Sequence, residues 1–167
     1  TTALSPGCER LMPKAKLELN WCTELDSSSW SKSAFVSAEI LPSIVSCCDC
    51  RIFVPNLRNV SVPKEIAAQA QVLDIREFTN SRSAGPSVLC LEDLASNIPL
   101  RNVLAEVSDT TLWLHDVHER EQSSGPALLE LAATSSRRLF TSMRNLEEFR
   151  SLCPGAKGES WLLPYPI

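Results

Sequence analysis

The stretch RIFVPNLRNVSVPKEIAAQAQVLDIREF, residues 51–78, decides the fold class of this chain of 167 residues. It opens with RIFVP, a short β-branched and aromatic run that a proline ends, as expected of a strand. PKEIAAQA follows, with proline at the first helical turn and good helix formers after it. VLDI is a second apolar run, with polar residues at its carboxyl end. Strand, helix and strand in succession are typical of a parallel sheet.

The same alternation recurs toward the carboxyl end of the chain. SVLCL at 87–91, TTLWLHD at 110–116 and RRLFTSM at 137–143 predict strands. Residues 92–108 have helical spacing, and GPALLELAATSS and NLEEFRSLCPG predict helices, the second capped by Asn145. The sequence therefore predicts an α/β fold of three layers, with a central, mainly parallel sheet covered on both faces.

The two ends of the chain show weaker patterns. KLELNW at 16–21 alternates like a half-buried strand, and residues 34–48 suggest a short helix that Pro42 breaks. We expect residues 1–60 to form an irregular segment that packs on a domain spanning 61–154. AKGESWLLPYPI has no period, so residues 155–167 are expected to be a linker.

Composition argues against several classes of partner. The chain has 16 basic and 20 acidic residues, and no long run of either sign, so we expect no nucleic-acid partner. No apolar run approaches the roughly 20 residues of a membrane span. Seven cysteines, an odd number, lie mostly beside apolar residues, which favours a reducing cytoplasmic or nuclear setting. In that setting the glycosylation sequon NVS at 59–61 is accidental.

Evidence for a metal or cofactor is weak. CCDC at 47–50 could supply two thiolates to zinc, but a second pair at the usual spacing is missing. HDVH at 115–118 holds both histidines of the chain. We expect no metal and no cofactor. One alternative stays open, an α/β enzyme that uses Asp74, Asp116 and His115 or His118, with or without a metal.

Polar groups fall at the carboxyl ends of three predicted strands, where ligands gather in parallel sheets. They are Asp74 with Arg76, Asp116 with His115, and the run from Ser142 to Arg144. A strand-end aspartate commonly accepts hydrogen bonds from the backbone or from arginine, which fixes the neighbouring loop. We therefore expect Asp74 and Arg76 to play a supporting, structural role.

The order of VLDIRE, TLWLHD, RRLFTS and LEEF resembles the rhodanese-like fold. Asp74 and Arg76 match that family's Asp-x-Arg, and Asp116, 42 positions later, stands where the catalytic cysteine would be. The resemblance covers about Pro63 to Pro154. It is closer to the non-catalytic rhodanese-like domains at the amino end of MAP-kinase phosphatases, and PYPI resembles the linker that enters the phosphatase domain in pseudophosphatase relatives.

This resemblance implies a degenerate active-site loop formed by His115, Asp116, His118 and Arg120, without a catalytic residue. A cysteine nucleophile needs backbone N–H groups around a thiolate, whereas a carboxylate there is already negative and would repel an anionic substrate. Asp116 would then occupy the anion cradle itself, and Arg120 could pair with it. The alternative is an ordinary strand-end or helix-capping aspartate.

The leading hypothesis is therefore a non-catalytic regulatory or docking domain within a larger phosphatase-like signalling protein. Arg137 and Arg138, with Arg144, would face a protein partner such as a kinase or a phosphoprotein. A third alternative is a structural subunit of an intracellular complex, motivated by Trp21 and Trp30 in the first 33 residues, which we expect to be exposed.

Overall fold

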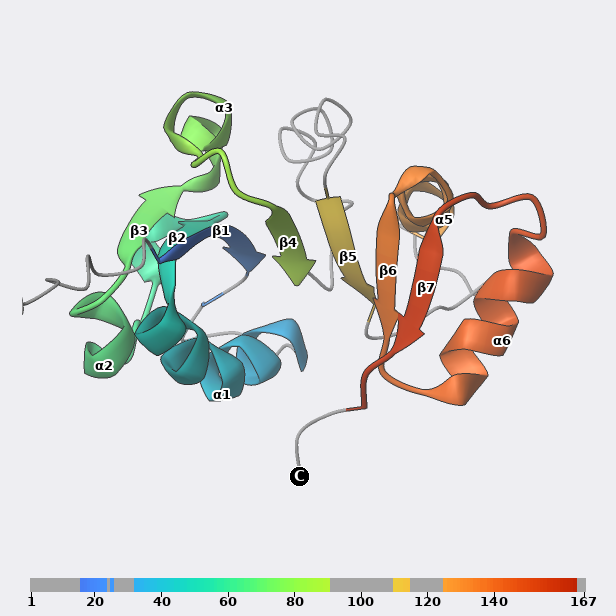
Figure 1. Ribbon diagram of the computed structural model, residues 1–167, viewed down its shortest axis with the longest axis horizontal. Helices are drawn as coiled ribbons and strands as arrows, with labels where there is room; N and C mark the ends of the chain where they lie inside the picture. Colours follow the sequence, from blue (N-terminus) through green and yellow to red (C-terminus); the bar gives the residue numbers. More distant parts are fainter. Residues whose placement is uncertain (1–15, 24, 26–31, 91–109, 115–124, 165–167) are drawn as a thin grey trace, which may run out of the picture.

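Seven parallel strands form one sheet among the residues that the structure describes (Figure 1). The structure is a computed structural model, and it describes residues 16–23, 25, 32–90, 110–114 and 125–164. The strands are β1 (Leu17–Thr23), β2 (Cys48–Val54), β3 (Gln71–Asp74), β4 (Ser87–Cys90), β5 (Thr110–Leu114), β6 (Arg137–Phe140) and β7 (Glu159–Leu162). They lie in the order β3-β2-β1-β4-β5-β6-β7, which confirms the α/β class with a parallel central sheet.

Helices cover both faces of this sheet. The helices are α1 (Lys32–Cys47), α2 (Lys64–Ala67), α3 (Phe78–Ser81), α5 (Gly125–Thr134) and α6 (Met143–Leu152), and two 3-10 turns are η1 (Leu57–Asn59) and η2 (Ile75–Glu77). Side chains of α1 and α2 belong to one buried cluster. Side chains of α3, α5 and α6 belong to a second cluster. We call the two sides of the sheet the α1 face and the α6 face, and together with the sheet they give three layers.

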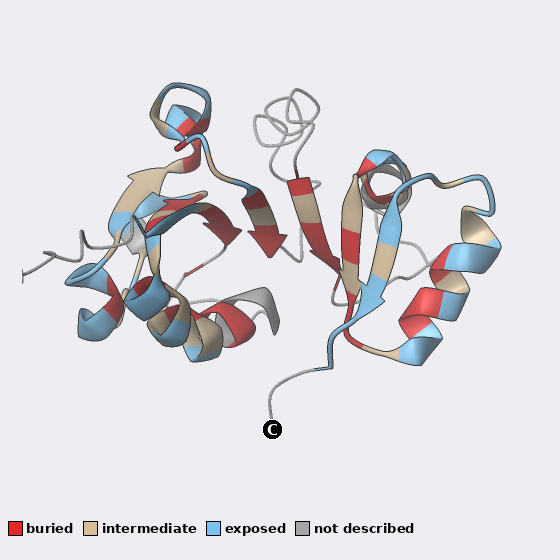
Figure 2. Ribbon diagram, in the orientation of Figure 1, coloured by how far each residue is buried: buried red, intermediate tan, exposed pale blue. Residues whose placement is uncertain are grey.

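Strict alternation along the strands divides the core between these faces, because successive side chains of a strand point to opposite sides. In β2, Ile52 packs on the α1 face and Phe53 on the α6 face. Trp21 and Trp113 meet edge to face in the α1 cluster, with ring centroids 6.3 Å apart. Buried residues are concentrated in the strands β1, β2, β4 and β5 (Figure 2).

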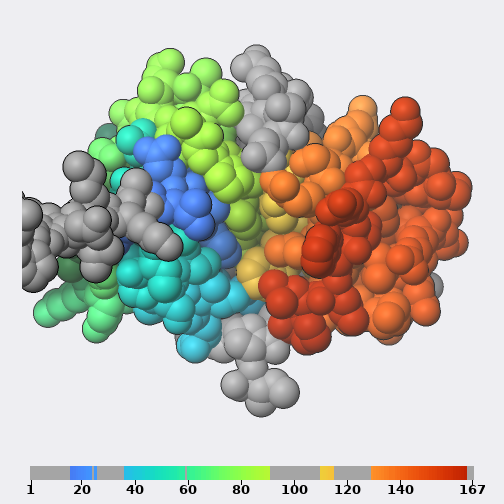
Figure 3. Space-filling view, in the orientation of Figure 1, coloured from blue at the N-terminus to red at the C-terminus, as the bar shows by residue number. Residues whose placement is uncertain are grey.

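The side of β1 on which successive strands join the sheet changes once along the chain. The chain adds β2 and β3 on one side of β1, then returns to place β4 on the other side and continues outward to β7. The space-filling view shows the segments up to β4 on the left of the molecule and those from β5 onward on the right (Figure 3). In doubly wound α/β sheets, ligands bind in the crevice beyond the carboxyl ends of the strands, at such a reversal.

The segment before residue 61 departs from the expectation. It was expected to be irregular, but it contains β1, α1 and β2, and β1 lies between β2 and β4 near the middle of the sheet. Helix α1 also continues through Pro42 to Cys47. Leu41 and Val45 are buried on either side of the proline. Packing of these side chains holds the helix together where the proline removes one backbone hydrogen bond.

The carboxyl-terminal segment also differs from the expected linker. Residues Glu159–Leu162 form β7, the edge strand beside β6.

Two single-residue expectations also differ from the structure. Ser142, rather than Asn145, caps α6, because its Oγ accepts a hydrogen bond of 3.2 Å from the Asn145 N–H. Trp21 is 3% exposed, so the idea of exposed tryptophans is wrong for that residue, and Trp30 lies outside the described residues.

The helical spacing expected for residues 92–108 likewise lies outside the described residues. Within the described part of the chain, no helix combines the length and the apolar composition that crossing a bilayer would require.

Candidate functional site

A cleft of about 1070 Å³ opens at the carboxyl ends of β2 and β3. Its lining comes from the residues that follow each strand, namely Pro55, Asn56, Leu57, Arg58, Asp74, Arg76 and Glu77. Both segments turn into short 3-10 turns directly after the strand ends, η1 after β2 and η2 after β3. The parallel pairing of Val54 with Asp74 brings the two strand ends together. We call this region the carboxyl-edge cleft.

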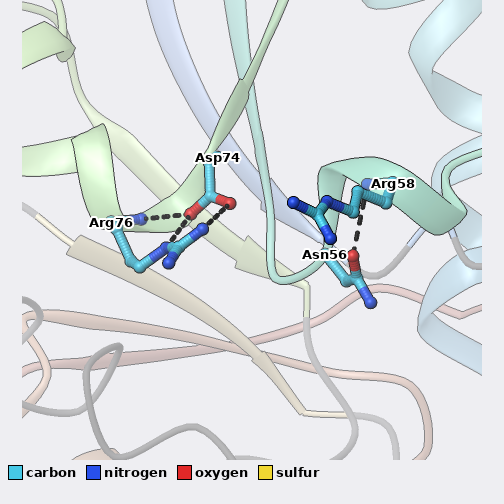
Figure 4. Close-up of polar contacts among 4 residues, drawn as sticks. All are labelled: Asn56, Arg58, Asp74 and Arg76. Atoms are coloured by element: carbon cyan, nitrogen blue, oxygen red, sulfur yellow. Dashed lines mark hydrogen bonds and ion pairs between the residues drawn. The ribbon is translucent and has the colours of Figure 1, made fainter.

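Asp74 and Arg76 form a bidentate ion pair on one wall of the cleft (Figure 4). Arg76 Nε donates to Asp74 Oδ1 and Arg76 Nη2 to Asp74 Oδ2, each at 2.9 Å. The Arg76 backbone N–H also donates to Oδ1, so Asp74 caps η2 with the hydrogen bonds expected of a strand-end aspartate. Hydrogen bonding from Arg76 lowers the pKa of the Asp74 carboxyl and raises the pKa of the Arg76 guanidinium.

Arg58 forms the opposite wall. Its backbone is held because the Asn56 side chain accepts a hydrogen bond of 3.2 Å from the Arg58 N–H and so caps η1. Figure 4 shows the Arg58 side chain extending from η1 toward Asp74. Arg58 is exposed, and its guanidinium makes no hydrogen bond or ion pair with any other described residue.

Sequence reasoning did not single out Asn56 or Arg58. The signal that could have found them is short: asparagine one residue after the proline that ends RIFVP, followed two residues later by arginine. Asparagine in such a place commonly accepts a hydrogen bond from the backbone two residues on. This turn would have placed Arg58 just beyond the carboxyl end of the predicted strand, whereas its nearness to Asp74 depends on the pairing of β2 with β3.

The structure does not bring the predicted strand-end groups into one site. Ser142 to Arg144 follow β6, whereas Asp74 ends β3, five positions away in the sheet. At about 4.8 Å between neighbouring strands, five steps separate the two ends by about 24 Å. His115, Asp116, His118 and Arg120 lie outside the described residues, so the degenerate active-site loop stays a prediction.

The three arginines expected to face a partner do not share a surface. Arg138 is 2% exposed, and its Nη1 donates to the carbonyl oxygens of Ala132 at 2.7 Å and Ser135 at 3.1 Å. Burial lowers its pKa from the ordinary arginine value. Arg137 points to the other face of β6, where its Nε donates to Thr111 Oγ1. Arg144 is exposed on α6. The expectation that Arg138 belongs to a partner-binding surface is therefore wrong.

A second cleft, of about 810 Å³, lies at the opposite, amino edge of the sheet. It is lined by residues from the starts of β1 and β2, the turn before β3 and the loop before β4, among them Glu18, Asp49, Gln69 and Gly85. The carboxylates of Glu18 and Asp49 and the ammonium group of Lys16 give this cleft a lining of mixed charge. We call it the amino-edge cleft.

The cysteines of the described segments are free thiols: Cys22, Cys47, Cys48, Cys50, Cys90 and Cys153. Burial raises the pKa of Cys22 above its ordinary range and that of Cys50 to about 12, so both are protonated, unreactive thiols at neutral pH. Among the described residues, no three His, Cys, Asp or Glu side chains converge as metal ligands would.

Comparison of the chain with protein-family models, with curated proteins and with solved structures gives no match. The rhodanese-like resemblance therefore stays a prediction, and the function has to be argued from the sheet and its clefts.

Proposed function

We propose that this domain binds a small-molecule ligand at the carboxyl edge of its sheet. The observation that carries the proposal is that the seven described strands are all parallel, so their carboxyl ends lie on one edge of the sheet. In open α/β sheets that edge is where ligands bind, because loops of adjacent strands separate there and leave a crevice. The carboxyl-edge cleft, with its charged side chains, lies on this edge at β2 and β3, one strand away from the reversal between β1 and β4.

Backbone-amide mapping by NMR tests the proposal. A panel of metabolites that includes nucleotides, sugar phosphates, amino acids and organic acids would be added to nitrogen-15-labelled protein. Shifts are expected at the carboxyl ends of the strands, around Val54–Arg58, Asp74–Glu77 or Thr141–Asn145. The amino-edge cleft serves as an internal comparison, since it is similar in size. Shifts confined to Glu18, Asp49 and Gly85, or no shifts with any compound, would contradict carboxyl-edge binding.

A second function, docking to a protein partner, is supported by a separate feature. On β7, Ser160 accepts a hydrogen bond from the buried Arg138 and so points to the α6 face. Trp161 therefore points to the α1 face by alternation and is 56% exposed, and Leu163, the residue that follows β7, is 43% exposed. Exposed aromatic and aliphatic side chains on an edge strand are typical of protein interaction surfaces. This surface suits the non-catalytic docking domain that the sequence suggests, in a larger phosphatase-like protein.

Proximity labelling in cells tests the docking function. The full-length wild-type protein is compared with Trp161→Lys and with Met143→Lys, a matched control on the exposed surface of α6. We expect the same set of labelled partners for the wild type and Met143→Lys, and loss of specific partners for Trp161→Lys. An unchanged set with Trp161→Lys would count against docking through β7.

A further inference from the structure

The carboxyl-edge cleft contains two arginines held in different ways: Asp74 fixes Arg76, whereas the guanidinium of Arg58 has no hydrogen-bond or ion-pair partner among the described residues. Arg76 is 77% exposed in its side chain, yet Asp74, only 14% exposed, holds its guanidinium by two hydrogen bonds. An exposed arginine normally loses rotamer freedom when it binds a ligand. Because Asp74 has already oriented Arg76, most of that entropic cost is met before any ligand arrives.

Arg76 keeps donors for a ligand after pairing with Asp74. A guanidinium has five N–H donors, and the contacts with Asp74 use Nε and one hydrogen of Nη2. The hydrogens of Nη1 and the second hydrogen of Nη2 have no acceptor among the described residues. Arg58, across the cleft, offers its whole guanidinium. Planar forks of this kind match the tetrahedral oxygens of phosphate, and two of them can hold one group.

The carboxylates of the cleft restrict the rest of the ligand. Glu77 lines the same cleft, and Asp74 Oδ2 accepts one hydrogen bond from Arg76, which leaves acceptor capacity. The two acids balance the two arginines in charge, so a bare polyanion gains no net attraction. A ligand that also carries hydroxyl groups can donate to these acceptors while its anionic group meets the arginines. The complementary molecule is therefore a phosphorylated polyol.

We propose that the carboxyl-edge cleft binds the phosphorylated sugar of a sugar phosphate or nucleotide, with the phosphate between Arg58 and Arg76 and the hydroxyls on Asp74 and Glu77. This inference rests on the proposed function, since it names the ligand class and the position of the site on the carboxyl edge. Phosphate held by exposed guanidinium groups is screened by ions, so binding is expected to weaken as salt is raised.

Titration calorimetry with four probes tests the chemistry of the ligand. The probes are ribose 5-phosphate, AMP, ribose and inorganic phosphate. We expect ribose 5-phosphate to bind more tightly than ribose or inorganic phosphate, because only the phosphorylated sugar engages both arginines and both acids. AMP distinguishes the two sources of the group: binding tighter than that of ribose 5-phosphate indicates a nucleotide, and weaker binding indicates a sugar phosphate. Inorganic phosphate binding as tightly as ribose 5-phosphate would overturn the polyol part of the proposal.

Variants locate the site. Arg58→Gln is expected to weaken binding of ribose 5-phosphate by about tenfold or more, since it removes charge-assisted hydrogen bonds without touching a contact within the fold. Arg144→Gln, an equally exposed arginine on α6, is the matched control and should leave affinity unchanged. Circular dichroism checks that both variants are folded.

The outcomes separate this inference from the broader proposal. If ribose 5-phosphate shifts amides elsewhere on the carboxyl edge and binds Arg58→Gln as tightly as wild type, the cleft is the wrong site while carboxyl-edge binding stands. If neither ribose 5-phosphate nor AMP binds, the ligand class is wrong, and the wider metabolite panel still decides whether the carboxyl edge binds a ligand.

Discussion

Arg138 shows what a single residue contributes to this fold. Its guanidinium is buried between β6, α5 and α6, lies 5.0 Å from the centroid of the Phe149 ring, and donates to Ser160 Oγ on β7. It meets carbonyl oxygens at the carboxyl end of α5, where the helix dipole favours positive charge. One side chain thus joins two strands and two helices, and a role in stability explains its burial.

We expect Arg138→Met to lower the free energy of unfolding by about 2 kcal/mol or more, because the carbonyls of Ala132 and Ser135 lose their donor in a buried place. Urea denaturation followed by circular dichroism measures this change. Arg150→Met, an exposed arginine on α6, is the control and should change stability by less than about 0.5 kcal/mol. Equal effects of the two substitutions would show that the buried contacts contribute little.

The ion pair of Asp74 with Arg76 predicts how the free energy of unfolding changes with pH. Arg76 lowers the folded-state pKa of Asp74 below the unfolded value of about 3.9. The stabilisation is therefore fully present above the unfolded pKa, and it is lost as pH falls through the folded pKa. We expect Asp74→Asn to lower the free energy of unfolding by up to about 1 kcal/mol at neutral pH, since Arg76 is exposed. The difference from wild type should vanish below the folded pKa.

Denaturation curves of wild type and Asp74→Asn, recorded from neutral pH down to strongly acidic pH, check this expectation. A gap that stays constant over the whole range would mean that the carboxylate charge is not the cause. At this scale the sequence was informative for Asp74, because its side-chain hydrogen bonds are made with Arg76, two residues further on. It could not show the burial of Arg138, whose partners come from α5 and β7.

At the scale of elements, local patterns predicted most strands and helices but failed where packing overrides them. Pro42 signals a helix end, yet buried Leu41 and Val45 carry α1 past it. The tail lacked a clear period because β7 is an exposed edge strand, which has little to bury. The sequence also did not predict the carboxyl-edge cleft, because Arg58 and Arg76 come to line one cleft only through the pairing of β2 with β3.

Gly158 is the position on which β7 depends. Its φ of +89° lies in the region that favours glycine, and a Cβ there would lie 2.6 Å from the Ser136 carbonyl oxygen. That oxygen accepts the hydrogen bond that starts β7, from the Glu159 N–H at 2.9 Å. We expect Gly158→Ala to detach β7 from β6 and to speed hydrogen exchange at the Leu163 amide, which donates to the Phe140 carbonyl.

Hydrogen exchange measured by mass spectrometry on peptides from β7 and from β1 tests this expectation. Gly155→Ala is the matched control, because a Cβ at Gly155 meets nothing within 4 Å. Exchange in β1 should not change in either variant. If β7 peptides of Gly158→Ala and Gly155→Ala exchange at the same rate, Gly158 is not what holds the strand.

At the scale of the whole molecule, the sequence predicted alternating strands and helices but not the order of the strands. Because strands and helices alternate along the chain, successive strands are expected to be parallel and joined by crossover connections. The reversal at β1, in contrast, depends on which strand β4 pairs with. Nothing local marks that choice. It is set by contacts between residues more than sixty positions apart, such as those of Asn20 with the loop before β4.

Asn20 is fully buried where β1 meets the loop before β4, at the junction between the half of the sheet formed by β3, β2 and β1 and the half formed by β4 to β7. Its Nδ2 donates to the carbonyl oxygens of Ser83 at 3.2 Å and Gly85 at 3.0 Å, and its Oδ1 accepts from the Ser83 N–H at 2.8 Å. Removing the amide leaves buried backbone groups without partners, so we expect Asn20→Ala to lower the free energy of unfolding by about 3 kcal/mol. Asn80→Ala, an exposed asparagine on α3, should have almost no effect.

Urea unfolding followed by two signals tests whether this junction holds the molecule together. In a variant that also carries Trp30→Phe and Trp161→Phe, tryptophan fluorescence reports on Trp21 of β1 and Trp113 of β5, on either side of β4, and far-ultraviolet circular dichroism reports on the whole fold. Because β1 and β4 link both halves into one sheet, we expect the two signals of Asn20→Ala to shift together to lower urea and to stay coincident, as in a single cooperative transition. Separate midpoints would mean that the strands β3, β2 and β1 unfold independently of the strands β4 to β7. The sheet would then consist of two cooperative units instead of one.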